Sequence, residues 1–171
     1  MRYAEPAPWV VALVSRLDRA DNVVARLMLN ARIDITQGLD GEPVVLACFD
    51  LGADELAASA QAVRVTAAER FRTASMSTDD VLELRELTAL ADELADLLRE
   101  PGMRSIVMRP ARLNAWRDAL THFVESREDA EWTREEDRAA LPAARSLLWP
   151  LEDLCADAMR AALSPPAPKA C

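Results

Sequence analysis

An amphipathic helix is the first regular element that the pattern of apolar residues predicts. Val10, Leu13, Val14 and Leu17 recur at intervals of three and four residues. That spacing places all four side chains on one face of a helix. We therefore expect a helix over about residues 9–21.

The period changes to two after this helix. Apolar residues between Leu27 and Ile35 alternate with mostly polar ones, which is typical of a strand with one buried face. Gly38 and Gly41 supply a turn, and residues 44–49 form a short apolar run. The sequence thus predicts a β-hairpin whose odd-numbered side chains in the first strand face the core.

Two helices are expected next, the first capped by Asp54 and the second beginning at Ser77. Residues 105–108 could add a third short strand, and the sequence leaves open whether residues 103–108 form one. The face expected to be buried on the first helix comprises Leu56, Ala60, Val63, Ala67 and Phe71. On the second helix it comprises Val81, Leu84, Leu87, Ala91, Leu94 and Leu98.

Two further helical regions complete the chain. The first covers residues 110–127, and a capping box of Thr133 and Glu136 opens the second. Pro142 and Pro150 both fall away from its apolar stripe, so we expect one bent helix or two nearly collinear ones. The helix over residues 110–127 is expected to bury Leu113, Trp116, Leu120 and Phe123.

These elements predict an α+β fold that is mostly helical. A β-hairpin, with or without a third short antiparallel strand, is packed by four or five helices. Residues 1–163 are expected to form a single globular domain, and residues 164–171 a flexible Pro-rich tail. A lone hairpin is only marginally stable in water, so helices must cover one of its faces.

The composition bears on location and partners. Against 29 acidic residues stand 20 basic ones, and the net charge of −9 repels nucleic acids and anionic lipids. No stretch approaches the ~20 apolar residues that span a bilayer, and no secretory signal is recognisable. We expect a cytoplasmic protein with neither nucleic acid nor membrane as a partner.

The sequence lacks the residue patterns that most catalytic sites and cofactor-binding sites need. Four glycines cannot build a phosphate-binding loop, and three widely spaced cysteines form no zinc pattern. The only histidine, His122, shares a polar helix face with Asp118 and Glu125, which favours a solvated charge cluster over a metal site. The sequence therefore predicts no cofactor and no metal, and favours a protein that is not an enzyme.

The remaining candidates for a binding surface are tryptophans and arginines. Trp116 lies on an apolar helix face, whereas Trp132 or Trp149 could be exposed as an interface anchor. Residues 99–117 contain five arginines and a single acid, Glu100. The candidate site for an anion or a partner comprises Arg104, Arg109, Arg112, Trp116 and Arg117.

Arg109 explains why these arginines could bind an anion. It immediately precedes Pro110, at the expected start of a helix, where free backbone N–H groups and the helix dipole favour a negative group. The expected occupant is, in order, an acidic helix of this protein, the carboxylates of a partner, or a phosphorylated ligand.

Two functional hypotheses survive. The leading one is a non-enzymatic protein-interaction or regulatory domain that self-associates, with a homodimer formed through the hairpin edge or the final helix. The alternative is a small-molecule or anion-binding protein, including an enzyme that uses carboxylates and arginines.

Overall fold

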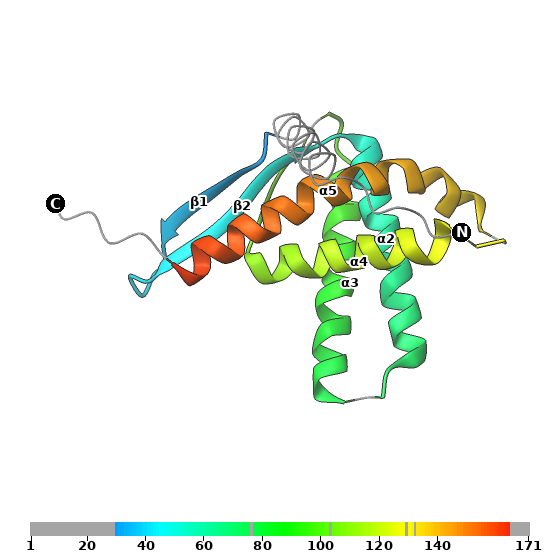
Figure 1. Ribbon diagram of the computed structural model, residues 1–171, viewed down its shortest axis with the longest axis horizontal. Helices are drawn as coiled ribbons and strands as arrows, with labels where there is room; N and C mark the ends of the chain where they lie inside the picture. The colour runs from blue at the N-terminus through cyan, green and yellow to red at the C-terminus, as the bar shows by residue number, and fades with distance from the viewer. Residues whose placement is uncertain (1–29, 76, 103, 129, 132, 165–171) are drawn as a thin grey trace, which may run out of the picture.

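The computed structural model describes residues 30–75, 77–102, 104–128, 130–131 and 133–164. Three strands and four helices lie in this part of the chain (Figure 1). They are β1 (Arg32–Gln37), β2 (Pro43–Leu51), α2 (Ala53–Thr73), α3 (Thr78–Leu98), β3 (Arg104–Met108), α4 (Pro110–Glu128) and α5 (Glu135–Leu163).

The strands form one antiparallel sheet in the order β1-β2-β3. The predicted hairpin is confirmed, the third strand that the sequence left open is present as β3, and the fold is mostly helical α+β. The expected helix over residues 9–21 and nearly all of the expected tail lie outside the described residues, as do Trp132 and Cys171.

Glycine closes the hairpin between β1 and β2. The Gly41 N–H donates to the carbonyl of Gly38 at 3.0 Å, and Gly41 has a φ of +83°. Glycine adopts this left-handed conformation without the steric cost of a Cβ atom. The Asp40 side chain accepts from the N–H of Glu42 at 3.2 Å, so the turn is closed by its own residues.

β1 is an edge strand, and its predicted face is only partly buried. Ile33 and Ile35 pair with Ala47 and Val45, which are buried, so the odd-numbered side chains do point toward the core side of the sheet. Ile33 is half-buried, but Ile35 is 41% exposed. The prediction that the whole odd-numbered face is buried is wrong at Ile35, because an edge strand has a neighbouring strand on one side only.

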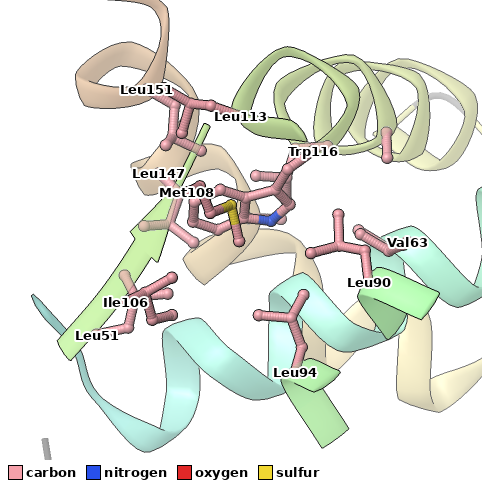
Figure 2. Packing of buried hydrophobic residues seen from close by; sticks show 14 of the residues in the cluster. Leu51, Val63, Leu90, Leu94, Ile106, Met108, Leu113, Trp116, Leu147 and Leu151 are labelled. Carbon is pink, nitrogen blue, oxygen red and sulfur yellow. The ribbon is translucent and has the colours of Figure 1, made fainter. Parts of the chain in front are cut away.

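One face of the sheet packs against α4 and α5, which lie side by side (Figure 1). Trp116 of α4 is fully buried there and stacks on Phe49 of β2 with ring centroids 5.1 Å apart. Figure 2 shows Trp116 with Met108 of β3 and Leu147 of α5 on one side and with Val63 of α2 and Leu90 of α3 on the other. All four residues of α4 that the sequence assigns to the core are buried.

Helix starts differ in how they are capped. Ser77 caps α3 as expected, since its hydroxyl accepts from the N–H of Asp80. The N-cap of α2 is Gly52, with no side-chain cap, so the assignment of Asp54 as its cap is wrong. The capping box is wrong too: Arg134 is the N-cap of α5, and the Thr133 hydroxyl donates to the carbonyls of Ala130 and Arg127.

α5 is one helix of 29 residues that continues through both of its prolines. Pro142 is exposed, as expected. Pro150 is buried, against expectation, because it lies three residues after Leu147 and four before Leu154 and therefore shares their face. The apolar proline ring thus packs as part of the core stripe.

Candidate functional site

A long apolar groove runs between α2 and α3, with a volume of about 1070 Å³. Its lining is rich in alanine and also includes Phe71, Leu84 and Leu98. The α2–α3 hairpin projects away from the rest of the protein (Figure 1). An apolar surface of this length on a projecting pair of helices is typical of a protein-interaction site.

The groove exists because α2 has two apolar faces. One face carries Leu56 and Val63, which are buried, while Ala60 and Ala67 line the groove and are half-buried. Phe71 also lines the groove and is 67% exposed. The sequence prediction merged the two faces into one stripe, so it is wrong for Phe71.

α3 contributes the other wall and is exposed over most of its surface. Only Leu87, Leu90 and Leu94 are buried, and the expected core residues Val81 and Leu98 are 46% and 36% exposed. α3 packs mainly on α2, with a small contact to α4. Its stripe is therefore buried along one narrow line and not across the wider face that the sequence predicts.

Charged side chains lie along the groove. Arg64 and Arg72 come from α2, and Arg85 and Asp92 from α3. Within the described residues, neither Arg85 nor Asp92 forms an ion pair, although Arg112 holds the adjacent Glu93. The groove thus offers one unpaired base and one unpaired acid seven residues apart on the same helix.

A polar network joins α2, α4 and α5 on another side of α2. Glu69 accepts from Arg127 and lies 2.7 Å from His122 Nε2, and Arg127 Nε donates to Asp137 at 3.0 Å. Asp137 is buried and also accepts from Gln61 at 2.6 Å. Charge-assisted hydrogen bonds therefore tie α2 to the consecutive helices α4 and α5, although Glu69 and Arg127 are 58 residues apart in the chain.

Glu69 is the electrostatic centre of this network. Burial raises the pKa of Glu69, but hydrogen bonds from Arg127 and His122 outweigh it and hold the pKa below its usual value. The carboxylate therefore stays charged where it is needed to hold α2 against α4.

The environment of His122 differs from the one that the sequence predicts. The sequence places it on a solvated face between Asp118 and Glu125, whereas the structure pairs it with Glu69 across the α2–α4 contact. Its side chain is 44% exposed. Sequence periodicity gives the direction of a side chain on its own helix, but the partner comes from another helix 53 residues away.

The predicted arginines meet different partners. Arg104 on β3 pairs with Glu100 at 3.5 Å, and Arg112 on α4 pairs with Glu93 of α3 at 2.7 Å. Arg117 binds the neighbouring Asp118 at 2.6 Å. Each of these contacts is to a carboxylate of this chain.

Arg109 and Trp116 stand apart from these pairs. Arg109 is exposed at the start of α4, where its carbonyl accepts from Leu113 N, and it forms no ion pair within the described residues. Trp116 is fully buried, so it belongs to the core beside these arginines and not to their surface. A binding role for the arginines stays a prediction.

Two other sequence features have a clear place. Trp149 on α5 is 52% exposed, which fits the expectation that one tryptophan outside the core is accessible. Cys48 and Cys155 are buried free thiols, and burial raises the pKa of Cys155 to about 11. A thiol of that pKa is a poor nucleophile at neutral pH.

Within the described residues, no group of three His, Cys, Asp or Glu side chains could hold a metal ion. None of the described helices is long and apolar enough to cross a membrane. Comparison with protein-family models, with curated proteins and with solved structures gives no match for this chain.

Proposed function

We propose that this protein is a non-enzymatic interaction domain that self-associates through the α2–α3 groove. The observation that carries the proposal is the groove itself, an open apolar surface about four helical turns long. The proposed occupant is the same surface of a second copy, which gives an isologous dimer with a two-fold axis.

The dimensions of the hairpin suit a dimer. α2 and α3 are each 21 residues long, which corresponds to about 30 Å at 1.5 Å per residue. Packed helices lie about 8–10 Å apart, so their shared face is about 20 Å wide with side chains included. Such a face approaches the ~800 Å² per partner that a stable dimer buries.

Charge on α3 favours a second copy over an unrelated partner. In an antiparallel contact whose two-fold axis passes beside Thr88, Arg85 of each copy lies opposite Asp92 of the other. Both residues line the groove, and both lack an ion pair within the described part of the chain. The same arrangement sets the small side chains of Thr88 and Ala89 at the axis, where helices can approach closely.

Sedimentation of the full chain over a range of concentrations tests the proposal. We expect a dimer for the unchanged protein and a monomer for Ala95→Arg, because an arginine on the apolar lining of the groove blocks close approach. Glu86→Arg is the matched control, since Glu86 is exposed on α3 outside the groove lining. A protein that stays monomeric at all concentrations contradicts self-association.

A charge-swap cycle tests the orientation of the two copies. Arg85→Asp and Asp92→Arg should each weaken the dimer about tenfold or more, because two symmetric ion pairs of ~1 kcal/mol become repulsive. The double variant should recover the original Kd. If the double variant is as weak as the single variants, this antiparallel contact is wrong.

The sequence analysis places self-association elsewhere, at the edge of the β-hairpin or at the final helix. Those surfaces give a different outcome in the same experiment. A dimer that survives Ala95→Arg at unchanged Kd would move the contact away from the groove and toward the edge of β1 or the exposed part of α5 around Trp149.

A further inference from the structure

A small pocket lies where the end of α4 and the start of α5 meet α2, beside the Glu69 network. Its volume is about 280 Å³. The lining consists of three small apolar side chains and five charged ones: Val65, Ala68, Ala130, Glu69, Arg72, Arg127, Arg134 and Asp137. A pocket of this size and lining has room for a small polar molecule with an apolar part.

Both carboxylates of the pocket already have cationic partners. Glu69 accepts from Arg127 and contacts His122, while Asp137 accepts from Arg127 and Gln61. The side chain of Asp137 is 3% exposed and that of Arg127 is 20% exposed. These two carboxylates are therefore fixed by their own network, and neither is left to neutralise a further arginine.

The arginines of the pocket have donors to spare. The side chains of Arg72 and Arg134 form no ion pair or hydrogen bond within the described residues, although both line the pocket. Arg127 keeps two donors as well, because a guanidinium has five N–H groups and this side chain makes three hydrogen bonds. Three arginines and two carboxylates give the lining one excess positive charge.

The acidic residues at the start of α5 do not belong to this lining. Glu136 contacts Arg64 at 3.8 Å on another side of the helix, where both line a different pocket. Glu135 is exposed and does not line the pocket. The excess positive charge therefore stays available to a ligand.

We propose that this pocket binds a small monocarboxylate with a short apolar body. The carboxylate accepts from Arg72 and Arg134, since a planar guanidinium matches a carboxylate with two parallel hydrogen bonds. One negative charge balances the pocket, and the apolar body packs on Val65, Ala68 and Ala130. Inorganic phosphate carries more charge and has no apolar body, so it is a poor ligand.

This inference does not rest on the proposed dimer. Arg72 and Ala68 line both the pocket and the α2–α3 groove, but Arg134 does not line the groove. A substitution of Arg134 therefore tests the ligand site without changing the surface proposed for self-association.

Thermal denaturation of the full chain, at one protein concentration and constant ionic strength, tests the site with butyrate as the probe. At roughly ten times its Kd, butyrate should raise the melting temperature by about 4 °C, because a ligand that binds only the folded protein stabilises it. Butyramide, which has the same apolar body without the charge, should raise it by less than about 1 °C, and so should inorganic phosphate.

The Kd, taken from the dependence of the melting temperature on butyrate concentration, tests the arginines. Arg134→Gln and Arg72→Gln should each raise it about tenfold or more, because each removes a charge-assisted hydrogen-bond donor. Arg138→Gln is the matched control and should leave the Kd unchanged. Arg138 is exposed on the same helix, forms no ion pair in the described part of the chain and does not line the pocket.

Three outcomes overturn the proposal. The first is a melting temperature that rises no more with butyrate than with sodium chloride or butyramide. The second is equal weakening by Arg134→Gln and Arg138→Gln, since the charge of the pocket then has no specific role. The third is stabilisation by phosphate that is lost in Arg134→Gln, which would assign the pocket to phosphate groups.

Discussion

α3 and α5 both carry a regular leucine stripe, but the protein uses them differently. Nine residues of α5 are buried, because α5 packs against α4, α2 and the sheet, whereas only three residues of α3 are buried. The difference lies in the neighbours and not in the helices themselves. It separates a body, formed by the sheet, α4, α5 and the face of α2 that contacts these two helices, from the projecting part of the α2–α3 hairpin, which carries the open apolar groove.

The largest expected contrast is between an aromatic residue in the body and one in the hairpin. Trp116→Ala should lower the free energy of unfolding by about 3–5 kcal/mol, because it empties a fully buried position that stacks on Phe49. Phe71→Ala should change it by less than about 0.5 kcal/mol, since Phe71 is 67% exposed. Urea denaturation of a monomeric background such as Ala95→Arg measures both. Similar losses would show that the hairpin tip is also part of the core.

Ion pairs should show the same contrast. Arg127→Met should cost about 3 kcal/mol, because it leaves the buried carboxylate of Asp137 without its cation. Arg70→Met should cost less than about 1 kcal/mol, since Arg70 and Glu83 are 40% and 46% exposed. The same substitution is thus compared in two environments by denaturation. Equal costs would contradict the distinction between body and hairpin.

Acidification should first weaken the network around Glu69, which holds α2 against α4. The pKa of Glu69 is lower in the folded protein than the ~4.3 of a free glutamate, so its contribution to stability is present above pH ~4.3. That contribution is lost as the pH falls through the lower, folded pKa. Glu69→Gln should therefore flatten the acid limb of a plot of melting temperature against pH.

Glu83→Gln serves as the control for this prediction. It removes a carboxylate of similar chemistry from α3, where its pair with Arg70 is exposed to solvent. The acid limb should keep its slope in this variant. An unchanged slope in Glu69→Gln would show that the network contributes nothing to acid stability.

The smallest expected effect concerns the tie between α3 and α4. Arg112→Glu should lower the melting temperature by about 3 °C, corresponding to ~1 kcal/mol, because it replaces the ion pair with Glu93 by repulsion. Arg109→Glu should have little effect, since Arg109 is exposed and unpaired within the described residues.

Phosphate distinguishes this internal role from a ligand site. If the arginines only serve the fold, millimolar phosphate should leave the melting temperature of the unchanged protein where it is. Stabilisation by phosphate that is lost in Arg112→Glu would instead support the anion-binding hypothesis.

Local sequence signals found the elements well. Alternation and turn glycines located the hairpin, and Ser77 marked the start of α3. Pro110 marked the start of α4. These signals are reliable because they depend on backbone conformation and on the few residues around each position.

The groove was missed because its residues look like core residues in the sequence. Ala60, Ala67 and Phe71 continue a plausible apolar stripe with Leu56 and Val63. The available hint was that α2 has apolar residues on two faces, one of which also carries arginines. No local rule says which of the two faces other helices will cover.

The sequence by itself therefore determined the class of fold, the order of its elements and the burial of Trp116, since periodicity and turn chemistry act over a few residues. Only the tertiary structure decided the partners: Glu69 for His122, Asp137 for Arg127, and open space for Phe71. Burial and electrostatic pairing depend on which elements meet, and the two pairs join residues that lie 53 and 10 positions apart in the chain.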